Sequence, residues 1–155
     1  MITDLKKGEV AEILPLNAIV QGLHAKMVPG QFYAAPEPAR LKSFYDDWVN
    51  DPDKFILVAR EDGQAVGYAA FSVTRREGNP FVRPQRNGEV DQIAVRTDRQ
   101  GRGIGTALIK AGKARLVAVG CHTISASYHV FNTASARLME KNGLNVRVMR
   151  VGAAL

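Results

Sequence analysis

The chain of 155 residues contains very little cysteine and histidine. Its one cysteine, Cys121, excludes an internal disulfide and fits a reducing compartment. The three histidines, His24, His122 and His129, do not have the spacing to acidic residues that is typical of metal ligands, so we expect no metal. No apolar stretch is long enough to cross a bilayer. These absences predict a cytoplasmic protein with no membrane partner.

The overall composition indicates one globular domain over residues 1–155, with 46% hydrophobic and 23% charged residues. The net charge is +6, and basic residues gather around 75–102. Because aromatic residues do not alternate with them, we expect no nucleic-acid partner, although a basic nucleic-acid or ribosome-associated module remains an alternative. A small ligand with several phosphates explains this local charge at least as well.

The most informative segment is an apolar strand that leads into a glycine-rich turn and then a helix. Residues 89–95 form the expected strand, and 96–106 read Arg-Thr-Asp-Arg-Gln-Gly-Arg-Gly-Ile-Gly-Thr. Glycines let a backbone approach a ligand closely, and the start of a helix presents unpaired amides and positive dipole charge to an anion. Arg99 and Arg102 add positive charge. The pattern predicts a phosphate-binding turn.

Two well-known phosphate motifs do not match this turn. A dinucleotide fingerprint needs a glycine three positions after Gly103, where this chain has Thr106. A nucleoside-triphosphate loop needs Gly-Lys followed by Ser or Thr, and this string does not occur. The turn therefore indicates another phosphate-bearing ligand.

The segment Gln100-Gly101-Arg102-Gly103-Ile104-Gly105 resembles the Gln/Arg-x-x-Gly-x-Gly/Ala signature of the GNAT acetyltransferase superfamily. Downstream, Asn132 and the string from Leu138 to Leu144 resemble the family's Asn-x-x-Ala-x-x-Leu-Tyr-Glu-Lys-x-Gly-Phe. The resemblance is strong over residues 89–144. It implies the GNAT acyl-CoA N-acyltransferase fold, an α/β (α+β) structure whose mixed, mostly antiparallel sheet has splayed strands and helices on both faces.

Local patterns predict the order of elements. Apolar spacing indicates helices, alternation indicates strands, and glycine and proline mark the turns. We expect helices over 9–26 (interrupted at Pro15), 41–49, 103–119 and 132–141, strands over 54–59, 64–73, 89–95, 122–130 and 144–151, a tight turn at 61–63, and loops over 29–38 and 75–88.

The resemblance implies acetyl-CoA as the cosubstrate. Its pantetheine arm would pair with the strand backbone, and its pyrophosphate would lie on the amides of the turn. A backbone amide near Ile93 or Ala94 would polarise the thioester carbonyl. The implied contacts are Ile93, Ala94, Val95, Gln100, Gly101, Arg102, Gly103, Ile104, Gly105, Thr106 and Asn132.

Two carboxylates are candidates for the general base. A primary amine is mostly protonated at neutral pH and must lose a proton before it attacks. The resemblance places Glu89 in this role, with Asp91 as a rival, since a regular strand would put both on one face with Ile93 and Val95. Either could instead be a solvated carboxylate at a strand edge.

The proton donor is less well defined. The family often has a tyrosine where this chain has Met139, and a thioether cannot donate a proton. Tyr128 or His129 could replace it, or solvent could protonate the thiolate. Asn132 has a second interpretation as a plain helix cap.

These observations predict direct transfer of an acetyl group to a primary amine in a ternary complex, without an acyl-enzyme. A small-molecule amine is the first expectation, and a peptide or protein amine is the second. An acyl-CoA-binding sensor without turnover is an alternative from another class. A homodimer is possible if the strand over 144–151 is exchanged or paired between copies.

Overall fold

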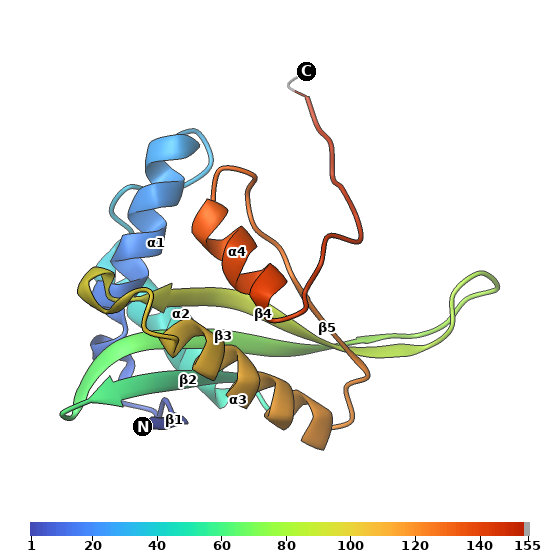
Figure 1. The fold of residues 1–155 in the computed structure, drawn as a ribbon, viewed down its shortest axis with the longest axis horizontal. Helices are drawn as coiled ribbons and strands as arrows, with labels where there is room; N and C mark the ends of the chain where they lie inside the picture. The colour runs from blue at the N-terminus through green and yellow to red at the C-terminus, as the bar shows by residue number, and fades with distance from the viewer. Residues whose placement is uncertain (154–155) are drawn as a thin grey trace.

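The computed structural model describes residues 1–153, which form a five-stranded sheet with helices on both faces (Figure 1). The strand order is β1-β2-β3-β4-β5; the first four strands are antiparallel, and β5 is parallel to β4. The strands are β1 (Ile2–Asp4), β2 (Lys54–Glu61), β3 (Gln64–Arg76), β4 (Gln85–Val95) and β5 (Thr123–Ala126). The helices are η1 (Val10–Glu12), α1 (Leu14–Met27), α2 (Pro38–Asn50), η2 (Thr97–Arg99), α3 (Ile104–Ala118) and α4 (Thr133–Lys141).

Each face of the sheet carries its own hydrophobic core. The helices α1 and α2 cover one face, where Leu16, Tyr45 and Trp48 are buried against β2 and β3. The helices α3 and α4 contribute to the core on the other face, and their buried residues include Leu108 and Met139. This arrangement confirms the predicted mixed, mostly antiparallel sheet between helices.

Several local predictions are confirmed. Pro15 lies in the first turn of α1, where the missing N–H costs no helical hydrogen bond, so the helix starts near it instead of breaking. Asp62 and Gly63 both have positive φ and close the predicted hairpin between β2 and β3. Asn132 caps α4, since its Oδ1 accepts a hydrogen bond from the Ser135 amide at 3.1 Å.

The predicted loop over 75–88 is shorter than expected, because 75–76 and 85–88 belong to strands and only 77–84 lie outside them. The strands β3 and β4 stay paired as far as Arg76 and Gln85 and project from the body as a long hairpin (Figure 1). A ladder satisfies backbone groups even where both faces are polar, so this extension has little hydrophobic pattern in the sequence.

Three predictions near the chain ends need correction. The strand over 144–151 is wrong, because no strand follows α4 within residues 1–153. The strand over 122–130 is shortened to Thr123–Ala126, and the short strand β1 was not anticipated. Alternating apolar residues indicate strand propensity only. Pairing needs a neighbouring edge, which is a tertiary property.

A bulge in β4 changes which side chains share a face. The register between β3 and β4 shifts between Ala70 and Phe71. Ala70 lies opposite Gln92 and Phe71 lies opposite Val90, so Asp91 is the extra residue. Such a bulge reverses the alternation beyond it.

The prediction that Glu89, Asp91, Ile93 and Val95 share one face is therefore wrong. Asp91 interacts with Ser72 and with Glu89, on the face covered by α1 and α2. Ile93 instead packs on the core beneath α3. Both acids keep a common face, but Ile93 and Val95 point to the other side, while Gln92 and Ala94 lie on the face of the acids.

The close approach of α3 to the sheet yields a stability prediction. A Cβ on Gly112 would lie 2.1 Å from Cζ of Phe71, whose ring is fully buried and stacked on Phe55. We expect Gly112→Ala to lower the free energy of unfolding by about 1–3 kcal/mol, measured by urea denaturation.

The matched control is Gly22→Ala in α1, where an added Cβ meets nothing within 4 Å. This change should raise the free energy of unfolding by about 0.5–1 kcal/mol, because alanine favours the helix. Equal effects of the two substitutions would contradict the packing of α3 on Phe71.

Candidate active site

The site is built where β4 and β5 separate. Their parallel pairing covers Asn87–Val90 and Thr123–Ala126 and then stops. Beyond this point the edge of β4 from Asp91 to Val95 has no strand beside it, within the described part of the chain. The predicted splay between these strands is confirmed.

A cavity of about 200 Å³ lies at this separation. The strand β4 forms its central wall, with α1 and the following loop on one side and the end of β5 with α4 on the other. Figure 1 shows α1 and α4 at the same end of the molecule. The lining residues are Asn17, Val20, Gln21, His24, Phe32, Val90, Asp91, Gln92, Ile93, Ala126, Ser127, Tyr128, Asn132, Ser135 and Met139.

The glycine-rich turn connects the end of β4 to the start of α3. Gly101 and Gly103 have φ of 76° and 83°, values that side chains with a Cβ rarely adopt. Gln100 donates from Nε2 to the Val95 carbonyl at 3.1 Å and ties the turn to the strand. Within residues 1–153, the amides of residues 101–106 have no hydrogen-bond acceptor. An anion could accept hydrogen bonds from these unpaired amides.

Gly105 has a different role in the same turn. A Cβ here would lie 3.0 Å from a Leu138 methyl carbon, so glycine allows α3 to pack closely against α4. The third glycine of the predicted motif therefore positions α4, whereas Gly101 and Gly103 shape the turn.

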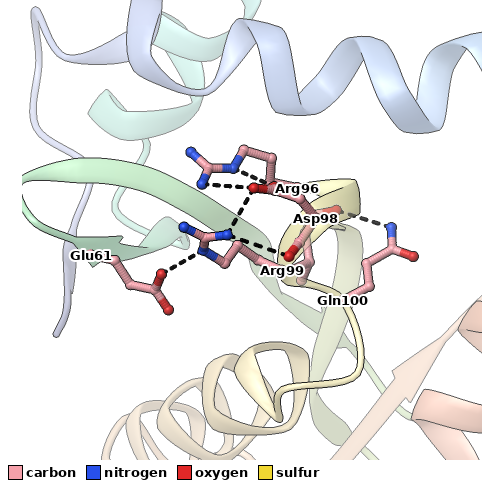
Figure 2. A network of polar contacts seen from close by, with 6 residues as sticks. Glu61, Arg96, Asp98, Arg99 and Gln100 are labelled. Carbon is pink, nitrogen blue, oxygen red and sulfur yellow. Dashed lines mark hydrogen bonds and ion pairs between the residues drawn. The ribbon is translucent and has the colours of Figure 1, made fainter.

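A network of ion pairs braces the turn (Figure 2). Asp98 receives hydrogen bonds from Arg96 Nε at 2.6 Å and from Arg99 Nη1 at 2.8 Å. Arg99 Nε also donates to Glu61 at 2.8 Å, which joins the turn to the β2–β3 hairpin. Arg99 is therefore engaged in the structure of the turn. Arg102 is exposed and forms no ion pair among the described residues, so its charge is available to a ligand.

The two candidate bases differ in their relation to the cavity. Asp91 lines it, whereas Glu89 is half-buried and does not. Asp91 is exposed at the cavity, and the neighbouring protein atoms partly desolvate its carboxylate. This desolvation, together with the charge of Glu89, raises the pKa of Asp91 to about 6 although the Ser72 hydroxyl acts in the opposite direction. A carboxylate with this pKa is a stronger base than an ordinary aspartate.

The far wall holds the other predicted residues. Tyr128 is half-buried and faces the cavity, and Met139 is buried beside it. Asn132 uses its Oδ1 as the cap of α4, so the cap interpretation is correct, and it also lines the cavity. Of the strand residues, Ile93 lines the cavity, whereas Ala94 and Val95 do not.

A buried polar cluster in the opposite wall was not anticipated from the sequence. Asn17 Nδ2 donates to the hydroxyls of Tyr45 and Tyr68 at 2.8 and 3.2 Å. The two hydroxyls donate to Gln92 Oε1 at 2.5 and 3.0 Å. Four residues from four elements meet here, and spacing in the sequence gives no signal of it.

An aromatic cluster joins the loop after α1 to the loop before α4. His129 and Phe131 stack with ring centroids 5.0 Å apart, and His24 contacts both rings. Phe32 completes the cluster at 5.0 Å from His24. Since His24 and Phe32 also line the cavity, the cluster closes one end of it.

Comparison with known proteins gives consistent results. The sequence model of the Acetyltransferase (GNAT) family matches residues 21–144. A mycothiol acetyltransferase of Propionibacterium freudenreichii is 30% identical over 141 residues, which cover 90% of this chain and 43% of that protein. This chain spans less than half the length of the first curated relatives it matches.

Solved structures share the fold. A crystal structure of a mutant BH1408 protein from Bacillus halodurans has a TM-score of 0.93 at 18% identity and covers 100% of this chain and 99% of its own. An aminoglycoside N-acetyltransferase in complex with CoA has a TM-score of 0.73 at 16% identity, with full coverage of both chains.

Two features are absent among residues 1–153. These residues contain no helix that is long and apolar enough to cross a membrane. They also contain no group of three or more His, Cys, Asp or Glu side chains that could hold a metal ion.

The raised pKa of Asp91 predicts a dependence of stability on pH. The folded protein holds this proton more tightly than the unfolded chain does, so the free energy of unfolding falls as pH rises from 3.8 to about 6. Asp91→Asn removes this contribution. We expect the variant to gain stability relative to wild type across that window and to keep the gain at higher pH, as measured by urea denaturation from pH 3.5 to 7.5.

The control is Asp98→Asn, because Arg96 lowers the pKa of Asp98. Its removal should cost stability at neutral pH, the opposite sign. A difference between Asp91→Asn and wild type that does not change between pH 4 and 6 would contradict the desolvation of Asp91.

Proposed function

Because this chain belongs to the GNAT acetyltransferase family, we propose that it moves the acetyl group of acetyl-CoA to the primary amine of a small molecule. Transfer is direct, in a ternary complex. The observation that carries the proposal is the cavity at the β4–β5 separation, which has an unpaired strand edge on one side; the same strand leads into a turn with free amides.

Residues of this chain could hold both the pyrophosphate and the pantetheine arm of CoA. The amides of residues 101–106 and the side chain of Arg102 would hold the pyrophosphate. The free edge of β4 near Ile93 to Val95 would pair with the amides of the pantetheine arm as with an added strand. Asn132 lines the same path, and its Nδ2 is left to donate because Oδ1 caps α4.

Asp91 is the better placed of the two bases. Its carboxylate takes one proton from the ammonium group, and the neutral amine then attacks the thioester carbonyl carbon. A backbone amide of β4 near Ile93 stabilises the developing oxyanion. The tetrahedral adduct then loses its second N–H proton to solvent, and the C–S bond breaks as the neutral amide forms. The thiolate takes a proton from solvent, or from Tyr128, which solvent then reprotonates. Glu89 then acts through its charge, which helps to raise the pKa of Asp91.

A small molecule is the favoured acceptor. The cavity is about 200 Å³, and similar proteins include enzymes named for mycothiol and for aminoglycosides. A peptide or protein amine is the second candidate, since the splayed edge of β4 could also bind an extended chain. A sensor that binds acyl-CoA without turnover is the third, because Met139 replaces the family's usual proton donor.

Binding and turnover separate these possibilities. Acetyl-CoA should raise the melting temperature, since binding to the folded state alone adds stability. A panel of small amines, peptides and lysine-containing proteins should then release free thiol in the enzyme and none in the sensor. Gly103→Val, which strains the turn at its positive φ, should weaken acetyl-CoA binding without changing the acceptor preference. No thermal shift at saturating acetyl-CoA would exclude the proposed function.

The identity of the base is tested by Asp91→Asn and Glu89→Gln. At pH 7, Asp91→Asn should lower kcat by about 100-fold or more, and Glu89→Gln should have a much smaller effect. Wild-type kcat should rise with pH through about 6, the pKa of Asp91. When the pH approaches the pKa of a free amine, about 10, the amine loses its proton to solvent. The loss of kcat in Asp91→Asn should then become smaller. A larger loss in Glu89→Gln would assign the base to Glu89.

A further inference from the structure

The buried cluster of Asn17, Tyr45, Tyr68 and Gln92 forms a closed circuit of hydrogen bonds in the wall of the cavity. The Asn17 amide has two N–H groups, and each points at one tyrosine oxygen. Each tyrosine has one O–H, and both point at the single Oε1 of Gln92. The two hydroxyls are 3.2 Å apart. The two N–H groups of Asn17, the two tyrosine hydroxyls and the two lone pairs of Gln92 Oε1 therefore all take part in hydrogen bonds.

The two amides must turn opposite ends toward the tyrosine hydroxyls. If the Gln92 amide alone were turned over, its N–H groups would face two hydroxyls that already receive N–H bonds from Asn17, and the tyrosine protons would have no acceptor on either amide. An unsatisfied buried donor costs more than a typical hydrogen bond contributes, so one amide donates and the other accepts. In the structure Asn17 donates and Gln92 accepts. Burial keeps the pKa of both tyrosines raised, so they remain O–H donors at neutral pH.

The circuit leaves two atoms free, and both belong to residues that line the cavity. They are the Nε2 of Gln92, which carries two donors, and the Oδ1 of Asn17, which is an acceptor; neither has a protein partner within residues 1–153. The buried side-chain atoms without a partner in that range are Asp46 Oδ1, Trp48 Nε1 and Arg86 Nε. Because Gln92 Nε2 and Asn17 Oδ1 are not among them, these two atoms are accessible to solvent. Tyr45 and Tyr68 are fully buried and hold them rigidly.

A neutral donor and a neutral acceptor therefore belong to residues that line the same cavity as Asp91, which precedes Gln92 on the bulged strand. A hydroxyl group matches this pair, because its oxygen can accept from Gln92 Nε2 while its proton is donated to Asn17 Oδ1. A plain alkyl amine would leave both atoms without partners once water is displaced.

We propose that this cluster makes the cavity selective for amines that also carry a hydroxyl group, the amino alcohols. The ammonium group binds Asp91, and the hydroxyl binds Gln92 and Asn17. The proposal rests on the proposed function, since it names the class of acceptor for the same site.

Three amines of similar size test the donor and the acceptor separately. They are 1-amino-2-propanol, its 2-methoxy ether, and 2-methylpropylamine. The alcohol can accept and donate, the ether can only accept, and the alkyl amine can do neither. In wild type we expect kcat/KM and affinity in the presence of CoA, measured by calorimetry, to be about tenfold or more better for the alcohol than for the alkyl amine, with the ether between them.

Gln92→Glu is the matched variant. One carboxylate oxygen can still accept from both tyrosines, so the circuit is kept, but the other oxygen replaces two donors by an acceptor. The ether should lose its advantage over the alkyl amine, while the alcohol keeps part of its own by donating to the carboxylate. Using ratios between amines removes the general effect of the added charge. Gln92→Leu, which ends the circuit, should abolish both preferences.

Each result leads to a separate conclusion. Equal affinity of the three amines for wild type would overturn the proposed selectivity while leaving acetyl transfer intact if thiol is still released. An ether-to-alkyl ratio that is the same in wild type and in a folded Gln92→Glu, checked by melting temperature, would overturn it as well. Discrimination in calorimetry without thiol release from any amine would support the selectivity and reject the transferase.

Discussion

The unpaired edge of β4 is the constraint on which the site depends. Pairing with β5 ends at Val90 and Ala126, and the strand continues for five residues without a neighbour on that side. Backbone amides and carbonyls cannot be left dry without a large cost, so this edge has to face water or a ligand. The cavity lies there for that reason, and the strand also delivers the chain to the turn that opens α3.

The bulge at Asp91 changes which face of the sheet the following residues of β4 point to. Before it, Glu89 faces α2, and after it, Ile93 faces α3. Asp91 and Gln92 both lie at the cavity because the extra residue breaks the alternation. Groups expected to bind CoA gather at α3 and α4, while a carboxylate and a neutral polar cluster lie toward α1. A regular strand would have separated the acid from the amide beside it.

Local sequence signals were sufficient where the structure itself is local. The glycine turn, the interruption near Pro15 between η1 and α1, the tight turn at Asp62 and Gly63, and the cap at Asn132 all depend on residues within about one turn of chain. They were predictable because φ limits and unpaired amides act over that range. The strand over 144–151 was not, since its alternating residues indicate propensity and the pairing partner lies elsewhere in the fold.

The sequence by itself determined the family, the glycine-rich turn and the short list of acids near it, because each is encoded in contiguous residues with restricted backbone or charge. The tertiary structure decided which acid reaches the cavity and what surrounds it. Asp91 is set by a register shift against β3, and the circuit through Asn17, Tyr45, Tyr68 and Gln92 joins residues up to 75 positions apart. Register and long-range hydrogen bonds arise only when distant strands and helices pack together.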